Sequence, residues 1–334
     1  MGEAMEDFEE LTIELTDWCP SRCLHCSSNS SPTCNNHLET KLVLQLIDES
    51  IKLGAKKISF GGGEPTASKS FVPAVARAVT SGVSVEVFTC GLGIFGGQLQ
   101  GLKSEIVNAC KQLHGVKFIF SFHGASEGVH DYVTQTPNSF RLLITSLEKC
   151  LSAGIDCEMN FVPMRVNVHE FRDLVDLAER FRIRRLSILR FVPQGRGLEN
   201  AEVLELNSEE ENSFVEEVLR LRAEKNIDIR TGSPFNGIVP GNEVPCRAGT
   251  GKMVVQANGN VLPCEVFKHH ERCKWNLSVY KQTLAEILSS LQIVALRNIL
   301  GESNCLMCPV HGALRARLES GVRYERIPKA AVQT

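Results

Sequence analysis

Three cysteines near the amino terminus have a spacing that can support metal chemistry. They lie in the stretch CPSRCLHC as Cys19, Cys23 and Cys26, and no second cysteine pair follows at the spacing of a four-ligand zinc site. Three thiolates on one loop can each bind one iron of a [4Fe-4S] cube and leave the fourth iron open for a small-molecule chelate. The missing fourth ligand therefore predicts an iron–sulfur cluster with one open position.

A second group of cysteines lies near the other end of the chain. Cys246 and Cys264 are followed by a CxxC pair, Cys305 and Cys308, while Cys273 is left over. Four thiols of this kind can bind a second metal centre. The remaining cysteines occupy mostly apolar or helical contexts, where a thiol usually behaves as a small hydrophobe: Cys34, Cys90, Cys110, Cys150 and Cys157.

Composition narrows the class of protein. The chain has 334 residues, 43% of them hydrophobic, with a formal net charge of −3 and a pI near 6.3, so we expect a globular protein without the basic surface of a nucleic-acid binder. The acidic start, MGEAMEDFEE, is unlike a secretory signal, and no long apolar run offers a membrane span. We therefore expect a cytoplasmic protein with neither nucleic acid nor membrane as a partner, in a reducing compartment that favours metal-bound cysteines over disulfides.

The elements that must position these thiols alternate between β-rich runs and helical patterns. We predict six strands, at 11–16, 57–60, 83–89, 116–122, 155–162 and 184–191. Helices are predicted at 41–53, 71–80, 103–113, 140–153 and 169–181, and a further helix opens at Ser208, with Glu211 completing a capping box. Successive strand–helix units imply a parallel sheet, either open and doubly wound or curved into a barrel, with functional groups at the carboxyl ends of the strands.

From about Ser233 the sequence changes character. Pro, Gly and Asn become frequent, cysteines return, and GKMVVQANGNVLPC is typical of a hairpin with a turn at Asn258-Gly259. A helix is expected over 284–300. Because the local apolar content is thin, we expect a small domain held together partly by metal, which divides the chain into residues 1–232 and 233–334.

The cysteine loop, with a glycine-rich segment one strand–helix unit downstream, resembles the radical S-adenosylmethionine (SAM) superfamily. The family signature is a CxxxCxxC loop after the first strand, and the spacing matches here, although His25 stands where the family usually has an aromatic residue. The segment GGGEP follows the second strand, and the resemblance implies that Gly62, Gly63, Glu64 and Pro65 bind the amino group of SAM. It also implies a partial (β/α)6 TIM-like barrel as the core domain.

Polar residues at the ends of later strands fall where the family commonly places contacts to the SAM ribose and carboxylate. They are Thr89, Ser121, His123, Asn160 and Arg190, with Asn167 as an alternative to Asn160. Each can equally be a structural loop residue. In the segment RFVPQGRG, Arg190 and Arg196 could clamp a carboxylate or phosphate, or could pair with Glu199 or Glu202 in a solvated loop.

The tail resembles the auxiliary-cluster domains of the same superfamily, called SPASM and twitch. Cys246, twelve residues, Gly259, four residues and Cys264 match their C-x(9-15)-G-x4-C opening, and Cys305 and Cys308 supply the later CxxC pair. The resemblance implies that these four cysteines bind one auxiliary [4Fe-4S] cluster. No thiol follows Cys308, which favours a twitch domain over a full SPASM domain. A structural zinc site from the same cysteines is the alternative.

The resemblance implies an enzyme with a radical mechanism. The open-iron cluster binds SAM and takes one electron from an external reductant of the flavodoxin or ferredoxin type. SAM cleavage then gives a 5′-deoxyadenosyl radical, which abstracts hydrogen from a substrate carbon. The auxiliary cluster is expected to assist oxidation of the substrate.

Three hypotheses compete for the function. The first is oxidation or rearrangement of a small polar metabolite or cofactor precursor, favoured because eighteen residues before Cys19 leave no room for a leader-peptide recognition domain. The second is a maturase that crosslinks, epimerises or oxidises a ribosomally made peptide or a protein side chain. The third is a non-catalytic iron–sulfur electron carrier, against which the placement of GGGEP argues.

Overall fold

The computed structural model describes residues 8–269 and 276–302. Cys273, Cys305 and Cys308 therefore lie outside the described residues, and so do the first residues of the chain. Within the described ranges, no helix has both the length and the apolar composition needed to cross a membrane.

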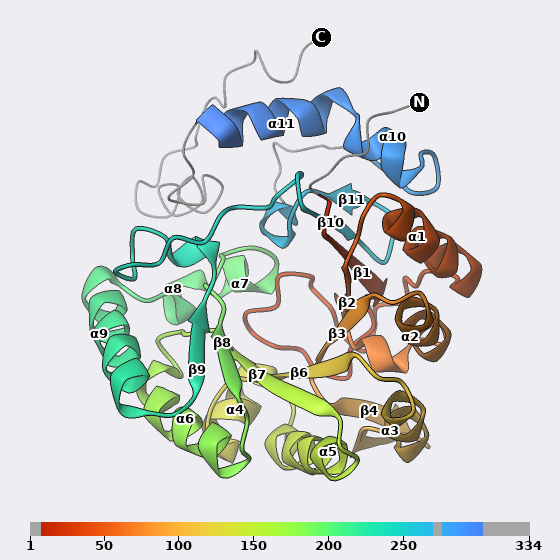
Figure 1. The fold of residues 1–334 in the computed structure, drawn as a ribbon. Coiled ribbons are helices and arrows are strands. Elements are labelled where there is room, and N and C mark those ends of the chain that lie inside the picture. The colour runs from red at the N-terminus through yellow and green to blue at the C-terminus, as the bar shows by residue number, and fades with distance from the viewer. Residues whose placement is uncertain (1–7, 270–275, 303–334) are drawn as a thin grey trace.

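One curved sheet forms the centre of the molecule. In the described part it has nine strands, in the order β11-β10-β1-β2-β3-β6-β7-β8-β9. These are β1 (Glu10–Thr16), β2 (Lys57–Gly62), β3 (Ser84–Thr89), β6 (Val116–Phe122), β7 (Asp156–Phe161), β8 (Arg185–Ile188), β9 (Asp228–Thr231), β10 (Lys252–Val255) and β11 (Val261–Leu262). Neighbours from β10 to β9 are parallel. The ends of the order, β11 and β9, are not paired with each other, so the sheet is a partial barrel (Figure 1).

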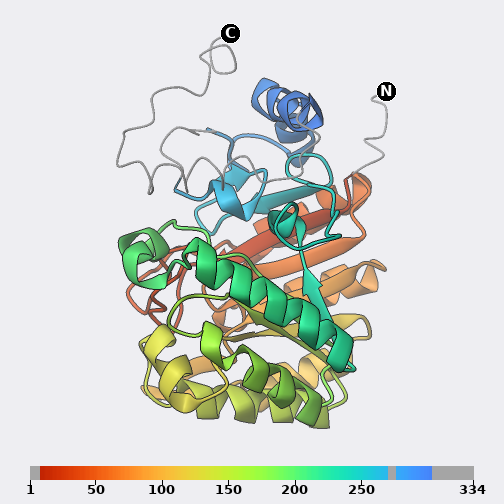
Figure 2. The ribbon, with the colours of Figure 1, turned by 90° about the vertical axis from the view of Figure 1, so that its left-hand side faces the viewer.

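Helices pack around this sheet. They are α1 (Thr40–Lys52), α2 (Phe71–Thr80), α3 (Ser104–Lys111), α4 (Glu127–Thr134), α5 (Ser139–Ser152), α6 (Phe171–Arg180), α7 (Arg196–Glu199), α8 (Ala201–Leu204), α9 (Ser208–Glu224), α10 (Leu284–Leu288) and α11 (Leu291–Glu302). Figure 2 shows α9 and α6 side by side on the outside, where Arg172 and Glu217 form an ion pair at 3.0 Å. The strand–helix alternation confirms the predicted α/β class with a parallel sheet.

The strands carry apolar side chains on one face and polar side chains on the other. In β1, the residues buried in the apolar core are Leu11, Ile13 and Leu15, and the residues that alternate with them are Glu10, Thr12 and Glu14. On the concave face, Lys57 of β2 forms ion pairs with Glu10 at 3.0 Å and with Glu86 of β3 at 3.1 Å. The barrel interior is therefore polar and partly charge-paired, and the apolar core lies between sheet and helices.

Two of the predicted elements were wrong in detail. The capping box of α9 is formed by Asn207 and Glu210, not by Ser208 and Glu211, because the Asn207 side chain accepts the Glu210 N–H at 2.9 Å and the Glu210 carboxylate accepts the Asn207 N–H at 2.7 Å. The helix predicted over 284–300 is divided into α10 and α11. The division falls at Ser289-Ser290, where the Ser290 hydroxyl accepts the Ile293 N–H of the next helix.

Several elements were not predicted at all. They are the hairpin of β4 (Leu92–Phe95) and β5 (Gln98–Gly101), the helices α4, α7 and α8, and the strand β9. The three helices are four to eight residues long, too short for a clear helical period. Strand β9 has only four residues, and two of them, Ile229 and Thr231, are buried.

The hairpin predicted around Asn258-Gly259 is present as β10 and β11, and it extends the main sheet. Strand β10 pairs with β1, with Met253 opposite Leu11. Met253, Val255 and helix residues such as Ile287 belong to the main apolar core. The apolar residues of the tail are thus buried largely against the barrel. The division of the chain at residue 232 stays a prediction.

Candidate cofactor site

The three cysteines of the first loop lie at the carboxyl end of β1. Cys19 is buried, and Cys23 and Cys26 are half-buried. Burial and the charges of Cys19 and Cys26 raise the pKa of the Cys23 thiol, so the three sulfur atoms lie within electrostatic reach of one another. Among the described residues, no three metal-ligating side chains converge on a single ion. In a [4Fe-4S] cube each thiolate binds a different iron, so the three thiols need not converge on a single ion.

The glycines of the GGGEP segment allow it to lie directly against the start of the cysteine loop. The Gly63 N–H donates to the Thr16 carbonyl at 2.7 Å, and the Glu64 N–H donates to the Trp18 carbonyl at 2.8 Å. A Cβ on Gly63 would lie 2.0 Å from the Trp18 oxygen, and Gly62 has φ +104° with Thr16 O 2.6 Å from its would-be Cβ. These glycines therefore position the cysteine loop as well as any ligand.

The Glu64 carboxylate is fully buried and receives hydrogen bonds from three residues. The Thr66 hydroxyl donates at 2.6 Å, the Thr89 hydroxyl at 2.8 Å and the Cys90 N–H at 2.9 Å. The Cys90 thiol also donates to it at 3.0 Å. Burial raises the Glu64 pKa, and the bonds from Thr66, Cys90 and Thr89 oppose that shift. With its carboxylate so occupied, the segment offers mainly backbone carbonyls to an ammonium group.

The segment 194–200, between β8 and α8, packs on the other side of the cysteine loop. The Arg196 side chain donates from Nε to the Cys23 carbonyl at 2.9 Å and from Nη2 to the Ser30 carbonyl at 2.6 Å. Its backbone N–H donates to the Cys26 carbonyl at 3.1 Å. The Asn200 amide donates to the Leu24 carbonyl at 3.1 Å.

Arg196 therefore positions the loop from outside. The sequence suggested a clamp on a carboxylate or phosphate, or an ion pair with Glu199 or Glu202. The contacts of Arg196 described above are instead with backbone carbonyls. Gly195 has φ +56°, and a Cβ there would lie 2.7 Å from the Cys26 carbonyl oxygen, so a glycine is required for this approach. The glycines beside Arg196 in the sequence were the available signal.

Other predicted site residues lie at the ends of neighbouring strands. Ser121 of β6 pairs in register with Asn160 of β7, on the concave face, and Asn160 is buried. His123 follows β6 and its ring lies 4.4 Å from the His25 ring, centroid to centroid. Asn167 is used structurally, since its amide donates to the His123 and Val162 carbonyls, both at 3.1 Å.

Buried polar atoms without a hydrogen-bond partner gather around this loop. In the described part of the chain they include Ser21 Oγ, His25 Nδ1, Asn29 Oδ1, Ser30 Oγ, His123 Nδ1 and Gln194 Oε1. Burial, with the Arg196 charge second, lowers the His25 pKa to about 4, so this imidazole is neutral. Unsatisfied buried polar groups are rare in folded proteins, and their concentration here fits a polar group bound beside the cysteines.

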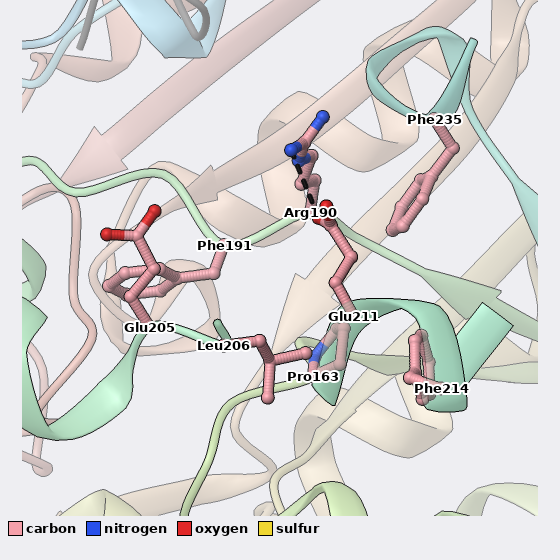
Figure 3. A pocket seen from close by; sticks show the side chains of 8 residues that line it. All are labelled: Pro163, Arg190, Phe191, Glu205, Leu206, Glu211, Phe214 and Phe235. Carbon is pink, nitrogen blue, oxygen red and sulfur yellow. Dashed lines mark hydrogen bonds and ion pairs between the residues drawn. The ribbon is translucent and has the colours of Figure 1, made fainter. Parts of the chain in front are cut away.

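Arg190 has structural partners at a different place. Its guanidinium donates to the Pro234 carbonyl at 3.0 Å and to Glu211 of α9 at 3.1 Å, and the side chain is 9% exposed. Figure 3 shows this pair at a pocket whose other lining residues are Pro163, Phe191, Glu205, Leu206, Phe214 and Phe235. These contacts connect the end of β8 to α9.

Two of the four tail cysteines can be placed. Cys246 and Cys264 are half-buried and pack beside a small apolar cluster, which we call the tail cluster: Ala248, Val254, Leu262, Phe267 and Leu296. Cys305, Cys308 and Cys273 lie outside the described residues. Cys110, Cys150 and Cys157 are buried in the main core, as expected of small hydrophobes.

Family models match both ends of the chain. The radical SAM superfamily model matches residues 13–178, and the SPASM iron–sulfur cluster-binding domain matches residues 246–309. The chain belongs to the radical SAM superfamily and carries a SPASM domain towards its C-terminus. It is an enzyme of a class that uses a [4Fe-4S] cluster and SAM, together with auxiliary iron–sulfur binding in the SPASM domain. The residues that bind these groups, and the single-cluster twitch interpretation, stay predictions.

The curated proteins similar to this chain include a maturase and a peptide cyclase. Mycofactocin maturase MftC of Mycobacterium ulcerans is 28% identical over 78% of this chain and 69% of its own length. The PqqA peptide cyclase of Methylobacterium nodulans is 27% identical over 76% of this chain and 66% of its own length. The structure of Streptococcus suis SuiB bound to the precursor peptide SuiA covers 97% of this chain and 70% of that chain with a TM-score of 0.68 at 16% identity, which supports the fold.

Proposed function

We propose that this enzyme modifies a ribosomally made peptide or a protein side chain. The observation that carries the proposal is the sequence similarity, over about three quarters of the chain, to a maturase and a peptide cyclase. The hypothesis of a small polar metabolite, preferred from the sequence, has less support, because neither of these relatives is named for such a substrate. The electron-carrier hypothesis does not explain the radical SAM match.

In this proposal Cys19, Cys23 and Cys26 bind the first cluster, and the backbone of Gly62 to Pro65 binds the amino group of SAM. When bound, the cluster and SAM supply a carbon-centred radical that abstracts hydrogen from the substrate. The chain's own contribution is to fix the cysteine loop between two segments and to exclude water. In this proposal Thr89 also acts through Glu64, to whose carboxylate its hydroxyl donates.

The concave face of the sheet is the proposed place for the substrate side chain. Ser121 and Asn160 lie there on adjacent strands, with Ser187 of β8 in register beside Asn160. Small polar groups of this kind can hydrogen-bond a peptide backbone and hold one C–H bond in position. His123, whose ring lies next to that of His25, is proposed to contact the nucleoside part of SAM.

The tail is proposed to bind an auxiliary [4Fe-4S] cluster through Cys246, Cys264, Cys305 and Cys308. Its role would be to accept the electron left on the substrate after hydrogen abstraction. An external one-electron reductant of the flavodoxin or ferredoxin type is proposed to reduce the first cluster.

The test is a reaction of the anaerobically reconstituted enzyme with SAM, dithionite and a short peptide encoded beside the gene. The expected result is methionine and 5′-deoxyadenosine together with a mass change in the peptide, absent in the variant with Cys19, Cys23 and Cys26 all changed to Ala. SAM cleavage with every neighbouring peptide unmodified, but with turnover of a polar metabolite, would contradict the peptide proposal.

A further inference from the structure

A buried lysine of the tail reaches the first cysteine loop. Lys268 is 6% exposed, and its ammonium donates to the Ser28 hydroxyl at 2.8 Å. It also forms an ion pair with Glu14 of β1, whose side chain is likewise 6% exposed. The Ser28 hydroxyl in turn donates to Glu14 at 3.3 Å. Ser28 lies two residues after Cys26, so this three-residue contact abuts the loop that carries the thiols.

The charges around Lys268 include that of a predicted cluster ligand. Burial lowers the Lys268 pKa, but the charges of Glu14, Glu265 and Cys26 outweigh it, so the pKa is raised. The ammonium is therefore cationic and within electrostatic reach of Cys26. Reduction of a cluster adds negative charge, which a fixed nearby cation stabilises in a dry site.

The tail, not the barrel, determines where Lys268 lies. Lys268 follows the short 3-10 helix of Glu265–Phe267, which begins directly after Cys264. Phe267 is buried in the tail cluster, and Glu265 pairs with Lys252 of β10 at 3.0 Å. The Gln194 amide donates to the Glu265 carbonyl at 3.0 Å, which connects the same turn to the segment that contacts the cysteine loop.

We propose that Lys268 is a positioning residue by which the tail adjusts the reduction potential of the first cluster. Its ammonium, four residues after Cys264, offsets the negative charge of Glu14. It thereby favours the reduced state of the cluster on Cys19, Cys23 and Cys26. This rests on the proposed function, since it requires a cluster at those cysteines.

Lys252 is the matching residue on the other side of the turn. Its side chain is half-buried, at 25% exposed, it pairs with Glu265 and Glu10, and Cys264 is among the charges that raise its pKa.

The experiment is a redox titration followed by electron paramagnetic resonance. The first cluster is assigned as the signal that changes when SAM is added, because SAM binds only at an open iron. Wild type is compared with Lys268→Arg, Lys268→Met, Glu14→Gln with Lys268→Met, and the control Lys252→Met. Iron content is measured for every variant, so that loss of a cluster is distinguished from a change in its potential.

Lys268→Met is expected to shift the SAM-responsive signal to a more negative potential. Lys268→Arg should stay near wild type, and removing Glu14 as well should return the potential towards it. Lys252→Met should shift the other signal more than the SAM-responsive one. If Lys268→Met loses iron, the potential of the SAM-responsive signal in the double variant, compared with wild type, is the test instead.

The inference is overturned if the potential of the SAM-responsive signal is unchanged in Lys268→Met at full iron content. It is also overturned if the potential in the double variant is as negative as in Lys268→Met. It is also overturned if Lys252→Met shifts that signal equally. Absence of any SAM-responsive signal in wild type would instead contradict the proposed function.

Discussion

The first cysteine loop and the tail surround their cysteines in different ways. In the first loop, the backbone carbonyls of Cys23, Cys26 and Ser30 accept hydrogen bonds from Arg196. The start of this loop is held against the barrel by the hydrogen bond from the Gly63 N–H to the Thr16 carbonyl. The two described tail cysteines, Cys246 and Cys264, pack instead beside the small tail cluster.

The difference concerns what sets the shape of each site. A loop whose carbonyls are bonded to other segments keeps its conformation without metal, and its thiols are then already near their bound positions. A site resting on a small apolar cluster gains more of its order from the metal, because binding free energy then contributes to folding. We therefore expect changes near Gly63, Glu64 and Arg196 to affect the first site, and changes in the tail cluster to affect the second.

The largest effect is expected from Gly63→Ala. The added Cβ would overlap the Trp18 carbonyl, whose oxygen lies 2.0 Å away, so the backbone of one loop must move. We expect a loss of more than about 3 kcal/mol of unfolding free energy and of the first-site iron. Anaerobic urea unfolding and iron analysis measure both. Gly128→Ala on α4 is the matched control, because its Cβ meets nothing within 4 Å; equal losses in the two variants would contradict the account.

Glu64→Gln should follow, with a loss of about 3 kcal/mol. The new amide NH2 would face either the Thr66 N–H or the Cys90 N–H, so one backbone donor would lose its acceptor. The iron content of the first site should fall while that of the tail is retained. Thr66→Val, which removes a single hydroxyl donor, is the milder comparison. A Glu64→Gln variant as stable as wild type would show that the carboxylate is not needed as an acceptor.

Val254→Ala tests the tail in the same way. Val254 is fully buried in the tail cluster, and losing two methyl groups should cost roughly 2 kcal/mol. The expected signature is faster release of iron from the tail to a chelator, with the first site unchanged. Faster release from the first site alone would reverse the proposed contrast between the two regions.

The smallest effect is expected from Arg196→Lys. Lysine keeps the charge but not the two-pronged contact to the Cys23 and Ser30 carbonyls, so we expect a loss of about 1 kcal/mol and modestly faster loss of first-site iron. Chelator kinetics measure this directly. Glu199→Gln, which removes the partner considered from sequence, should behave as wild type; a larger effect there than at Arg196 would support the solvated-loop alternative.

The sequence predicted those parts of the molecule that a local pattern encodes. The CxxxCxxC loop, the GGGEP segment, the parallel sheet and the hairpin at Asn258-Gly259 each have a residue spacing or period of their own. Short elements such as α7, α8 and β9 have no such period, and their formation depends on packing. The capping box was placed one residue late because Ser208 and Asn207 are both good caps, and only the structure distinguishes them.

Contacts between distant segments could not be predicted. Arg196 contacts Cys23 across 173 positions, and Lys268 contacts Ser28 across 240. Arg190 and Arg196 were expected to have similar roles, whereas Arg190 contacts Glu211 of α9 and Arg196 contacts the cysteine loop. The contact of Thr89 with SAM stays a prediction, and the hydrogen bond from its hydroxyl to Glu64 could not be predicted from the sequence. In each case the residue type indicated a polar role, but the sequence did not indicate which residue it would contact.

The most direct test of the account is the iron and acid-labile sulfide content after anaerobic reconstitution, for wild type and for the variant with Cys19, Cys23 and Cys26 all changed to Ala. We predict about eight irons per chain in wild type and about four in the variant, corresponding to two [4Fe-4S] clusters with one in each region. About four irons falling to none, with zinc retained, would contradict the auxiliary cluster and make the tail a structural zinc site. Undiminished iron in the variant would contradict the assignment of the first loop.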